Sequence, residues 1–174
     1  MKRNFFAGSA VLPLVLFLLF LTSCGAQSYD EDMKEEDITL PYLTEEFSKQ
    51  LLTDGAEHLV GSIEPVASED GSSQILLHPK EVASSPDADG TYPAVSYVRT
   101  DSLSVPDQMY GSFGDPPSVL SASEFLAAVE ADLKDSGQSF DEYGDYLLYD
   151  VYALDGQALL ILYNPSYVLQ TPNP

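Results

Sequence analysis

Residues 146–163 read YLLYDVYALDGQALLILY, and this stretch decides the fold. The dipeptide Asp155-Gly156 favours a tight turn, so the sequence predicts an antiparallel hairpin of two strands, Tyr146–Leu154 and Gln157–Tyr163. The run Ala158–Leu162 is apolar without alternation, which is typical of a central strand covered on both faces.

A second hairpin is predicted upstream of the first. Its strands are His58–Val66 and Ser73–His78, and Asp70-Gly71 between them is a strong hairpin signal. A further strand, Tyr92–Arg99, alternates only weakly, and its Pro93 indicates an edge position or a strand start.

Two segments have the spacing of amphipathic helices. The first begins near Thr44 and ends before Gly55, a plausible C-cap. The second begins with Ser121 and Glu124 at capping-box spacing and ends before Gly137. Each has one apolar face, formed by Leu43, Phe47 and Leu51 in the first helix and by Phe125, Leu126, Val129 and Leu133 in the second.

These elements predict an α+β fold, because no parallel βαβ run is recognisable. We expect a small antiparallel sheet or partial barrel of about five strands, with two helices packed on one face or end. Residues 100–120 are rich in Ser, Pro, Gly and Asp, so we predict an irregular loop there. A loop of that length is uncommon in a compact domain, which indicates a functional or mobile segment.

The N-terminal stretch has the pattern of a signal segment. Lys2 and Arg3 precede an apolar run from Phe5 to Leu21, and the only cysteine, Cys24, follows in the sequence LTSCG. This sequence resembles the lipobox of bacterial lipoproteins. The resemblance implies a signal peptide over residues 1–23, removed so that Cys24 becomes the lipidated first residue. An uncleaved membrane anchor and a secreted protein with a free cysteine are the alternatives.

The remaining chain divides into three parts by composition. Residues 24–37 carry the lipidated cysteine and an acidic, extended tether. Residues 38–168 form a single globular domain, which we expect to be monomeric, and residues 169–174 read as a disordered tail. The resemblance places this domain outside the cytoplasm, anchored by lipid in the outer leaflet of the cytoplasmic membrane.

The charge of the chain limits its partners. The formal net charge is −21, and loss of Lys2 and Arg3 would make the chain still more acidic. Nucleic acid is excluded as a partner, because its binding depends on cationic contacts to phosphate. Solubility explains the acidity most simply. A cationic partner or a divalent ion is the alternative explanation, and no cofactor is indicated.

Tyrosines are concentrated near the C-terminus. We select Tyr146, Tyr149, Tyr152 and Tyr163 as ligand-binding candidates, because tyrosine supplies binding area at a low entropy cost. Ordinary strand packing is the competing interpretation.

Catalytic and metal-binding patterns are weak. His58 and His78 would need a third ligand such as Glu57 or Glu81, and Asp87-Ala-Asp-Gly90 matches only a fragment of a calcium loop. Neither G-x-S-x-G nor S-x-x-K occurs, so we assign no catalytic or metal residue. We expect a non-catalytic interaction or ligand-binding domain. The alternatives are a small envelope hydrolase or metal-dependent enzyme, and a structural or inhibitory module that acts on a partner protein.

Overall fold

The structure is a computed structural model that describes residues 38–67 and 72–170. The predicted signal peptide, Cys24, the tether and the Asp70-Gly71 turn therefore lie outside the described residues. The described part contains two helices, α1 (Ser48–Thr53) and α2 (Ala122–Ser136), together with nine strands, which confirms the α+β class. The strands are β1 (Glu57–Ala67), β2 (Ser73–Val82), β3 (Tyr92–Ser96), β4 (Asp101–Ser104), β5 (Tyr110–Phe113), β6 (Ser118–Ser121), β7 (Tyr149–Leu154), β8 (Gln157–Tyr163) and β9 (Tyr167–Leu169).

The nine described strands form one mixed sheet in the order β6-β5-β8-β7-β1-β2-β3-β9. Strand β4 pairs with both β2 and β8, so the pairings β8-β7-β1-β2-β4 close into a ring. Strand β5 runs parallel to β8, and β9 runs parallel to β3. The prediction of about five antiparallel strands is thus wrong in strand number and in direction, although both predicted hairpins are present.

Residues 100–120 are not the irregular loop that we predicted. They contain β4, β5 and β6, each four residues long. Strands β4 and β5 pair with distant parts of the chain, as in Leu103 opposite Ile75 and Gly111 opposite Ile161, whereas β6 pairs among the described strands with its neighbour β5. A four-residue segment that contains Ser or Gly shows too little apolar periodicity to be recognised as a strand from the sequence.

The C-terminal hairpin has the predicted turn. Asp155 and Gly156 both adopt positive φ angles, 51° and 76°, as a type I′ turn requires. Residues Ala158–Leu162 of β8 are all buried, which confirms a strand covered on both faces. The preceding strand starts three residues later than predicted, because residues 144–146 form a 3₁₀ turn before β7.

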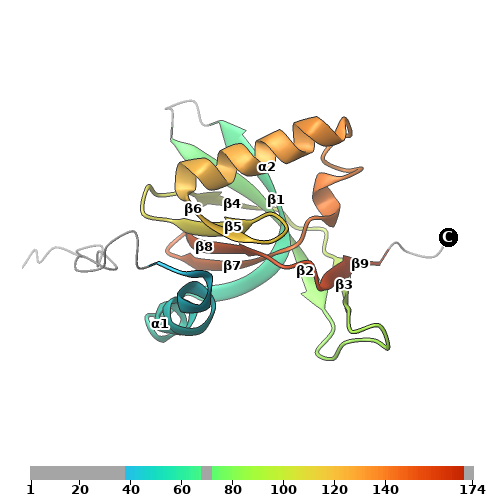
Figure 1. Cartoon of the computed structure of the whole chain (residues 1–174), viewed down its shortest axis with the longest axis horizontal. Helices are drawn as coiled ribbons and strands as arrows, with labels where there is room; N and C mark the ends of the chain where they lie inside the picture. Colours follow the sequence, from blue (N-terminus) through green and yellow to red (C-terminus); the bar gives the residue numbers. More distant parts are fainter. Residues whose placement is uncertain (1–37, 68–71, 171–174) are drawn as a thin grey trace, which may run out of the picture. The chain divides into compact units, whose positions relative to one another are not determined.

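Helix α2 is capped at both ends as the sequence predicts. The Glu124 carboxylate accepts hydrogen bonds from the backbone N–H of Ser121 at 3.0 Å and from its hydroxyl at 2.6 Å. Gly137 ends the helix in the left-handed conformation. The helix packs on β5 and β6 above the sheet (Figure 1), where the absence of a side chain at Gly111 leaves room for the Phe125 ring.

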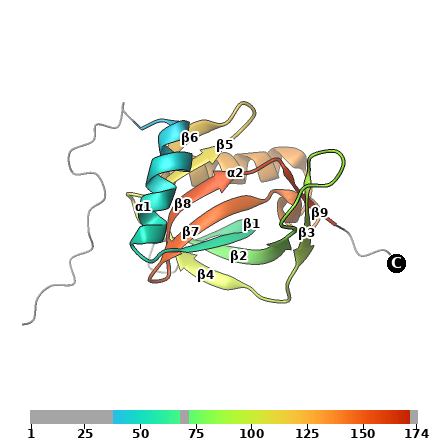
Figure 2. The ribbon, with the colours of Figure 1, turned by 90° about the horizontal axis from the view of Figure 1, so that it is seen from below.

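Helix α1 covers a different part of the sheet. A π-helical turn, Tyr42–Phe47, leads into it, and the predicted apolar face of Leu43, Phe47 and Leu51 is buried. The helix contacts β7, and the Phe47 ring lies 6.1 Å from the Tyr110 ring of β5. Figures 1 and 2 both show α1 on the opposite side of the fold from β3 and β9.

The end of the described chain is ordered further than we predicted. The proposed tail began at residue 169, but Leu169 belongs to β9 and the N–H of Gln170 donates to the carbonyl oxygen of Ala94 at 2.8 Å. Residues 171–174 lie outside the described residues. Within the described ranges, neither helix has the length and apolar character needed to cross a bilayer.

Candidate functional site

The four candidate tyrosines do not share one surface. Tyr149 and Tyr152 lie on opposite faces of β7, because side chains alternate along a strand. Tyr149 is fully buried, whereas Tyr146 in the 3₁₀ turn is 45% exposed. Tyr152 is half-buried and stacks on His58, with ring centroids 4.7 Å apart. The structure therefore does not gather these residues into a single binding surface.

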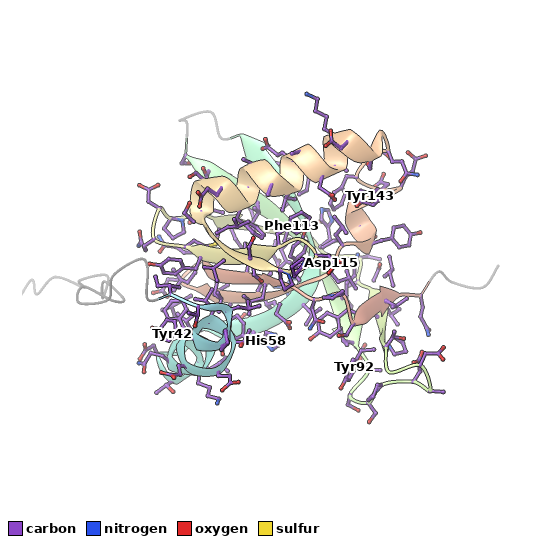
Figure 3. The ribbon with its side chains drawn as sticks, viewed as in Figure 1. Tyr42, His58, Tyr92, Phe113, Asp115 and Tyr143 are labelled. Carbon is purple, nitrogen blue, oxygen red and sulfur yellow. The ribbon has the colours of Figure 1, made fainter. Side chains whose placement is uncertain are left out.

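Tyr149 packs among aromatic rings in the core beneath α2. Its ring meets Phe125 edge-on at 6.0 Å, and it lies 5.6 Å from Tyr163. Phe113, labelled in Figure 3, contacts Tyr163 edge-on at 5.5 Å. Burial raises the pKa of the Tyr149 hydroxyl well above its ordinary value. Strand packing, the competing interpretation in the sequence, is the role that this environment gives to Tyr149.

Asp150 of β7 holds the C-terminal segment against the sheet. One carboxylate oxygen accepts from the Tyr167 hydroxyl at 2.9 Å and lies 2.7 Å from Nε2 of His58. The other accepts from the Asn164 amide at 3.0 Å. Burial acts to raise the pKa of Asp150, but these hydrogen bonds outweigh it and lower the pKa below its ordinary value. Asp150 is therefore an ionised anchor for β9.

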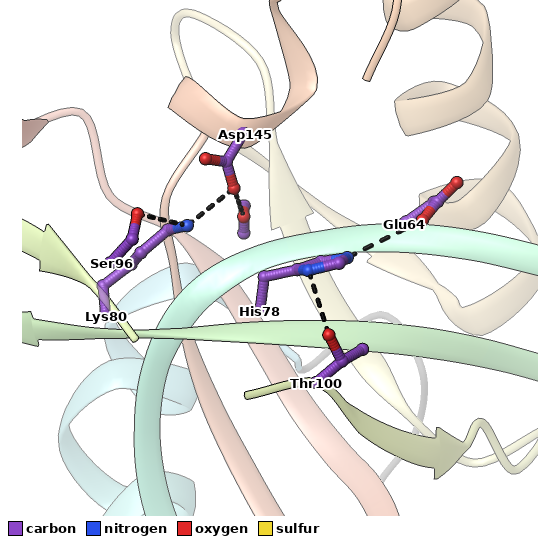
Figure 4. Close-up of polar contacts among 7 residues, drawn as sticks. Glu64, His78, Lys80, Ser96, Thr100 and Asp145 are labelled. Atoms are coloured by element: carbon purple, nitrogen blue, oxygen red, sulfur yellow. Dashed lines mark hydrogen bonds and ion pairs between the residues drawn. The ribbon is translucent and has the colours of Figure 1, made fainter. Parts of the chain in front are cut away.

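A second polar cluster, around Lys80, fixes β3 (Figure 4). The side chain of Lys80 is 3% exposed, and its ammonium donates to Asp145 Oδ1 at 2.6 Å and to Ser96 Oγ at 3.1 Å. The hydroxyl of Ser62 donates to the same Asp145 oxygen at 2.5 Å. One buried ion pair thereby joins β1, β2, β3 and the 3₁₀ turn.

The two histidines are in separate environments. His58 contacts Asp150, whereas Nε2 of His78 lies 3.6 Å from Glu64 and its ring lies 4.9 Å from that of Phe140. Figure 3 shows His58 near α1, and Figure 4 shows His78 beside β2. Neither Glu57 nor Glu81 completes a metal site with them. No group of three His, Cys, Asp or Glu side chains among the described residues could hold a metal ion.

The Asp87–Gly90 segment, compared above with a calcium loop, forms a turn. The Asp87 carboxylate accepts hydrogen bonds from the backbone N–H groups of Asp89 and Thr91 and from the Thr91 hydroxyl. These bonds lower the pKa of Asp87, the Thr91 hydroxyl contributing most. The turn closes the connection between β2 and β3.

Several exposed apolar side chains lie on the other side of β3 and β9. Val95 is 55% exposed, Tyr97 53% and Val168 46%. Pro93 pairs with Val168, and Val95 pairs with Glu81 of β2, so these side chains share one face. The Tyr97 hydroxyl donates to Glu81 at 3.0 Å, which brings its ring to that face. We call Pro93, Val95, Tyr97 and Val168 the outer β3–β9 face.

The opposite face of these two strands is packed. Ala94 is fully buried, and Tyr92 meets Tyr167 edge-on at 6.2 Å. With the Lys80 and Asp150 clusters on this inner side, the strands are held from one face while the other faces solvent. Tyr92, labelled in Figure 3, marks this part of the fold. One apolar face of these two strands is therefore exposed, although the other is packed.

Sequence reasoning did not select the residues of the outer β3–β9 face. The signal was present in Tyr92–Arg99, where apolar residues occupy both faces of a segment that Pro93 marks as an edge. In the structure Pro93 lies near the start of β3, which pairs with both β2 and β9 and is therefore not the edge of the sheet, and one of its two apolar faces stays exposed. Val168 carried no such signal, because it lies next to the boundary that we set for the disordered tail.

Comparison with known proteins gives no relative for this chain. No family model matches it, and neither a curated protein nor a solved structure matches it significantly.

Proposed function

We propose that this protein is a membrane-anchored, extracytoplasmic lipoprotein whose domain binds a protein partner through the outer β3–β9 face. The observation that carries the binding role is the exposure of Val95, Tyr97 and Val168 on one side of strands that are packed on the other. Scattered apolar residues are ordinary on protein surfaces, but a contiguous group on a fixed scaffold is typical of an interaction site.

The anchor rests on the LTSCG sequence. A diacylated or triacylated Cys24 would keep the protein on the membrane, because each buried CH₂ contributes about 0.8 kcal/mol of membrane affinity. We expect Cys24→Ala to abolish incorporation of labelled fatty acid and to release the protein from the membrane fraction. Labelling that persists in the variant would contradict lipid attachment at this residue.

Charge selects the class of partner. The chain has a net charge of −21, and Glu81 lies on the face itself. The nearest basic side chains do not offset this charge, because Lys80 is buried against Asp145 and Arg99 pairs with Asp101 at 2.7 Å. Complementary charge favours association, so a cationic protein fits this surface, whereas a second copy of the acidic chain is repelled.

Site-specific photo-crosslinking in the producing cells tests the binding role. A benzophenone amino acid replaces Val95 or Val168 on the face and, as the matched control, Leu52 of α1, which is exposed to the same degree (47%). We expect one discrete adduct from both face positions and none from Leu52. Equal crosslinking from all three positions, or adducts from Leu52 alone, would contradict the proposal.

A further inference from the structure

Strand β9 ends the described sheet with an unpaired edge. Among the described strands it pairs only with β3, over Tyr92–Ala94 and Tyr167–Leu169. The N–H of Tyr92 donates to the Ser166 carbonyl and the N–H of Gln170 to the Ala94 carbonyl, both at 2.8 Å. Backbone groups alternate in direction along a strand, so those of Leu169 and the carbonyl of Tyr167 point away from β3.

Apart from its length of three residues, this edge lacks the features that usually prevent pairing with another chain. Natural edge strands are commonly protected by lysine, proline or inward-pointing charge. The residues of β9 are Tyr167, Val168 and Leu169, without a charge or a proline among them. The outward N–H and carbonyl groups thus lie beside an apolar surface to which side chains of an added strand can bind.

The edge is also held in place before any partner arrives. The Tyr167 hydroxyl and the Asn164 amide both donate to Asp150, and the N–H of Ser166 donates to the Asn164 side chain at 3.1 Å. A preorganised strand does not pay ordering entropy on binding, which leaves more of the interaction energy for affinity.

We infer that β9 accepts an extended, cationic segment of the partner as an additional strand of the sheet. This inference rests on the proposed function and specifies its binding mode. Main-chain hydrogen bonds to Leu169 and Tyr167 supply affinity in this mode, and alternate side chains supply specificity. Apolar residues of the segment lie beside Val168 on the outer β3–β9 face, and its basic residues are attracted by the acidic surroundings.

The test uses a labelled peptide, acetyl-Val-Lys-Val-Lys-Val-Lys-amide, and the full chain in non-ionic detergent. We expect saturable binding by fluorescence anisotropy that weakens as salt rises. A peptide of the same charge with every backbone amide N-methylated should bind about tenfold more weakly, because neither of its edges can complete the main-chain bonds. A peptide with Glu in place of Lys should not bind.

A matched pair of chain variants locates the site. Leu169→Pro removes the outward N–H without removing a bond to β3, and Leu169→Ala keeps it. We expect about a tenfold loss of peptide affinity in Leu169→Pro relative to Leu169→Ala, with circular dichroism showing both variants folded. Should Leu169→Pro unfold the chain, the N-methylated peptide against the Leu169→Ala protein decides the question.

Two outcomes would overturn the inference. Equal binding of the N-methylated and unmodified peptides would show that attraction is purely electrostatic, and absence of binding would remove the site altogether. Neither outcome alters the crosslinking result, so adducts at Val95 and Val168 would still support protein binding through the face by side-chain contacts alone.

Discussion

Removal of the Asp145 side chain should destabilise the domain far more than its position in a short turn suggests. Asp145→Ala leaves the buried ammonium of Lys80 without its counter-charge and the Ser62 hydroxyl without its acceptor. Breaking a buried ion pair from one side costs about 3–5 kcal/mol. The Asp145 side chain is 23% exposed, so water compensates in part, and we expect about 3 kcal/mol, the lower end.

The double variant Asp145→Ala/Lys80→Met separates charge from packing. It removes the unpaired ammonium of Lys80 while keeping an apolar side chain of similar length. We therefore expect the free energy of unfolding to fall by only about 1 kcal/mol relative to the wild type. Asp141→Asn, an exposed carboxylate in the same segment, is the control and should change stability by less than about 0.5 kcal/mol.

Urea unfolding followed by circular dichroism measures these differences. With a slope of about 1.5 kcal/mol/M, a loss of about 3 kcal/mol lowers the midpoint by about 2 M. The reasoning would be refuted if Asp145→Ala unfolded at the wild-type midpoint, or if the double variant were less stable than Asp145→Ala. Either result would mean that Lys80 is not held by this ion pair.

Other predictions test the hydrogen bonds of Asp150 to the β9 segment and the packing of α2 on Gly111. The pKa of Asp150 is lowered in the folded state, so its contribution to stability is present above the ordinary value of about 4 and is lost as pH falls through the folded pKa. The Tm of Asp150→Asn should therefore fall less than that of the wild type between about pH 6 and pH 3. An equal fall in the two proteins would contradict this prediction. Gly111→Ala should cost about 1–3 kcal/mol in thermal unfolding, because the new Cβ would lie 2.4 Å from the Phe125 ring. Ser123→Ala on the exposed side of α2 is its control and should leave Tm nearly unchanged.

Local rules account for what was predicted correctly. The Asp155-Gly156 turn, the Ser121–Glu124 cap and the Gly137 stop each depend on residues within one turn of the chain. The burial of Leu43 and of the apolar run in β8 follows from spacing alone. The predicted hairpins were present for the same reason, since a hairpin joins neighbours in sequence.

Apart from the missed local hairpin of β5 and β6, the errors in strand pairing concern segments that are distant in sequence. Strand β4 closes the ring by pairing Ser104 with Gln157, and β5 joins β8 in parallel, and neither pairing leaves a periodic signal in a four-residue segment. The tyrosine candidates do not lie on one surface, because Tyr149 and Tyr152 alternate along β7, Tyr146 lies in the 3₁₀ turn and Tyr163 lies in β8. Asp145 and Lys80 are 65 residues apart, so no local pattern could have paired them.

The sequence by itself determined the α+β class, two hairpins, two helices, the caps of α2 and the acidic character, because these depend on neighbouring residues or on composition. Only the tertiary structure decided the mixed direction of the sheet, the burial of Tyr149 and the exposure of Val95 and Val168. These properties depend on which faces remain uncovered after distant strands pair. The proposed binding face is one of them, since β3 and β9 meet across more than 70 residues of chain.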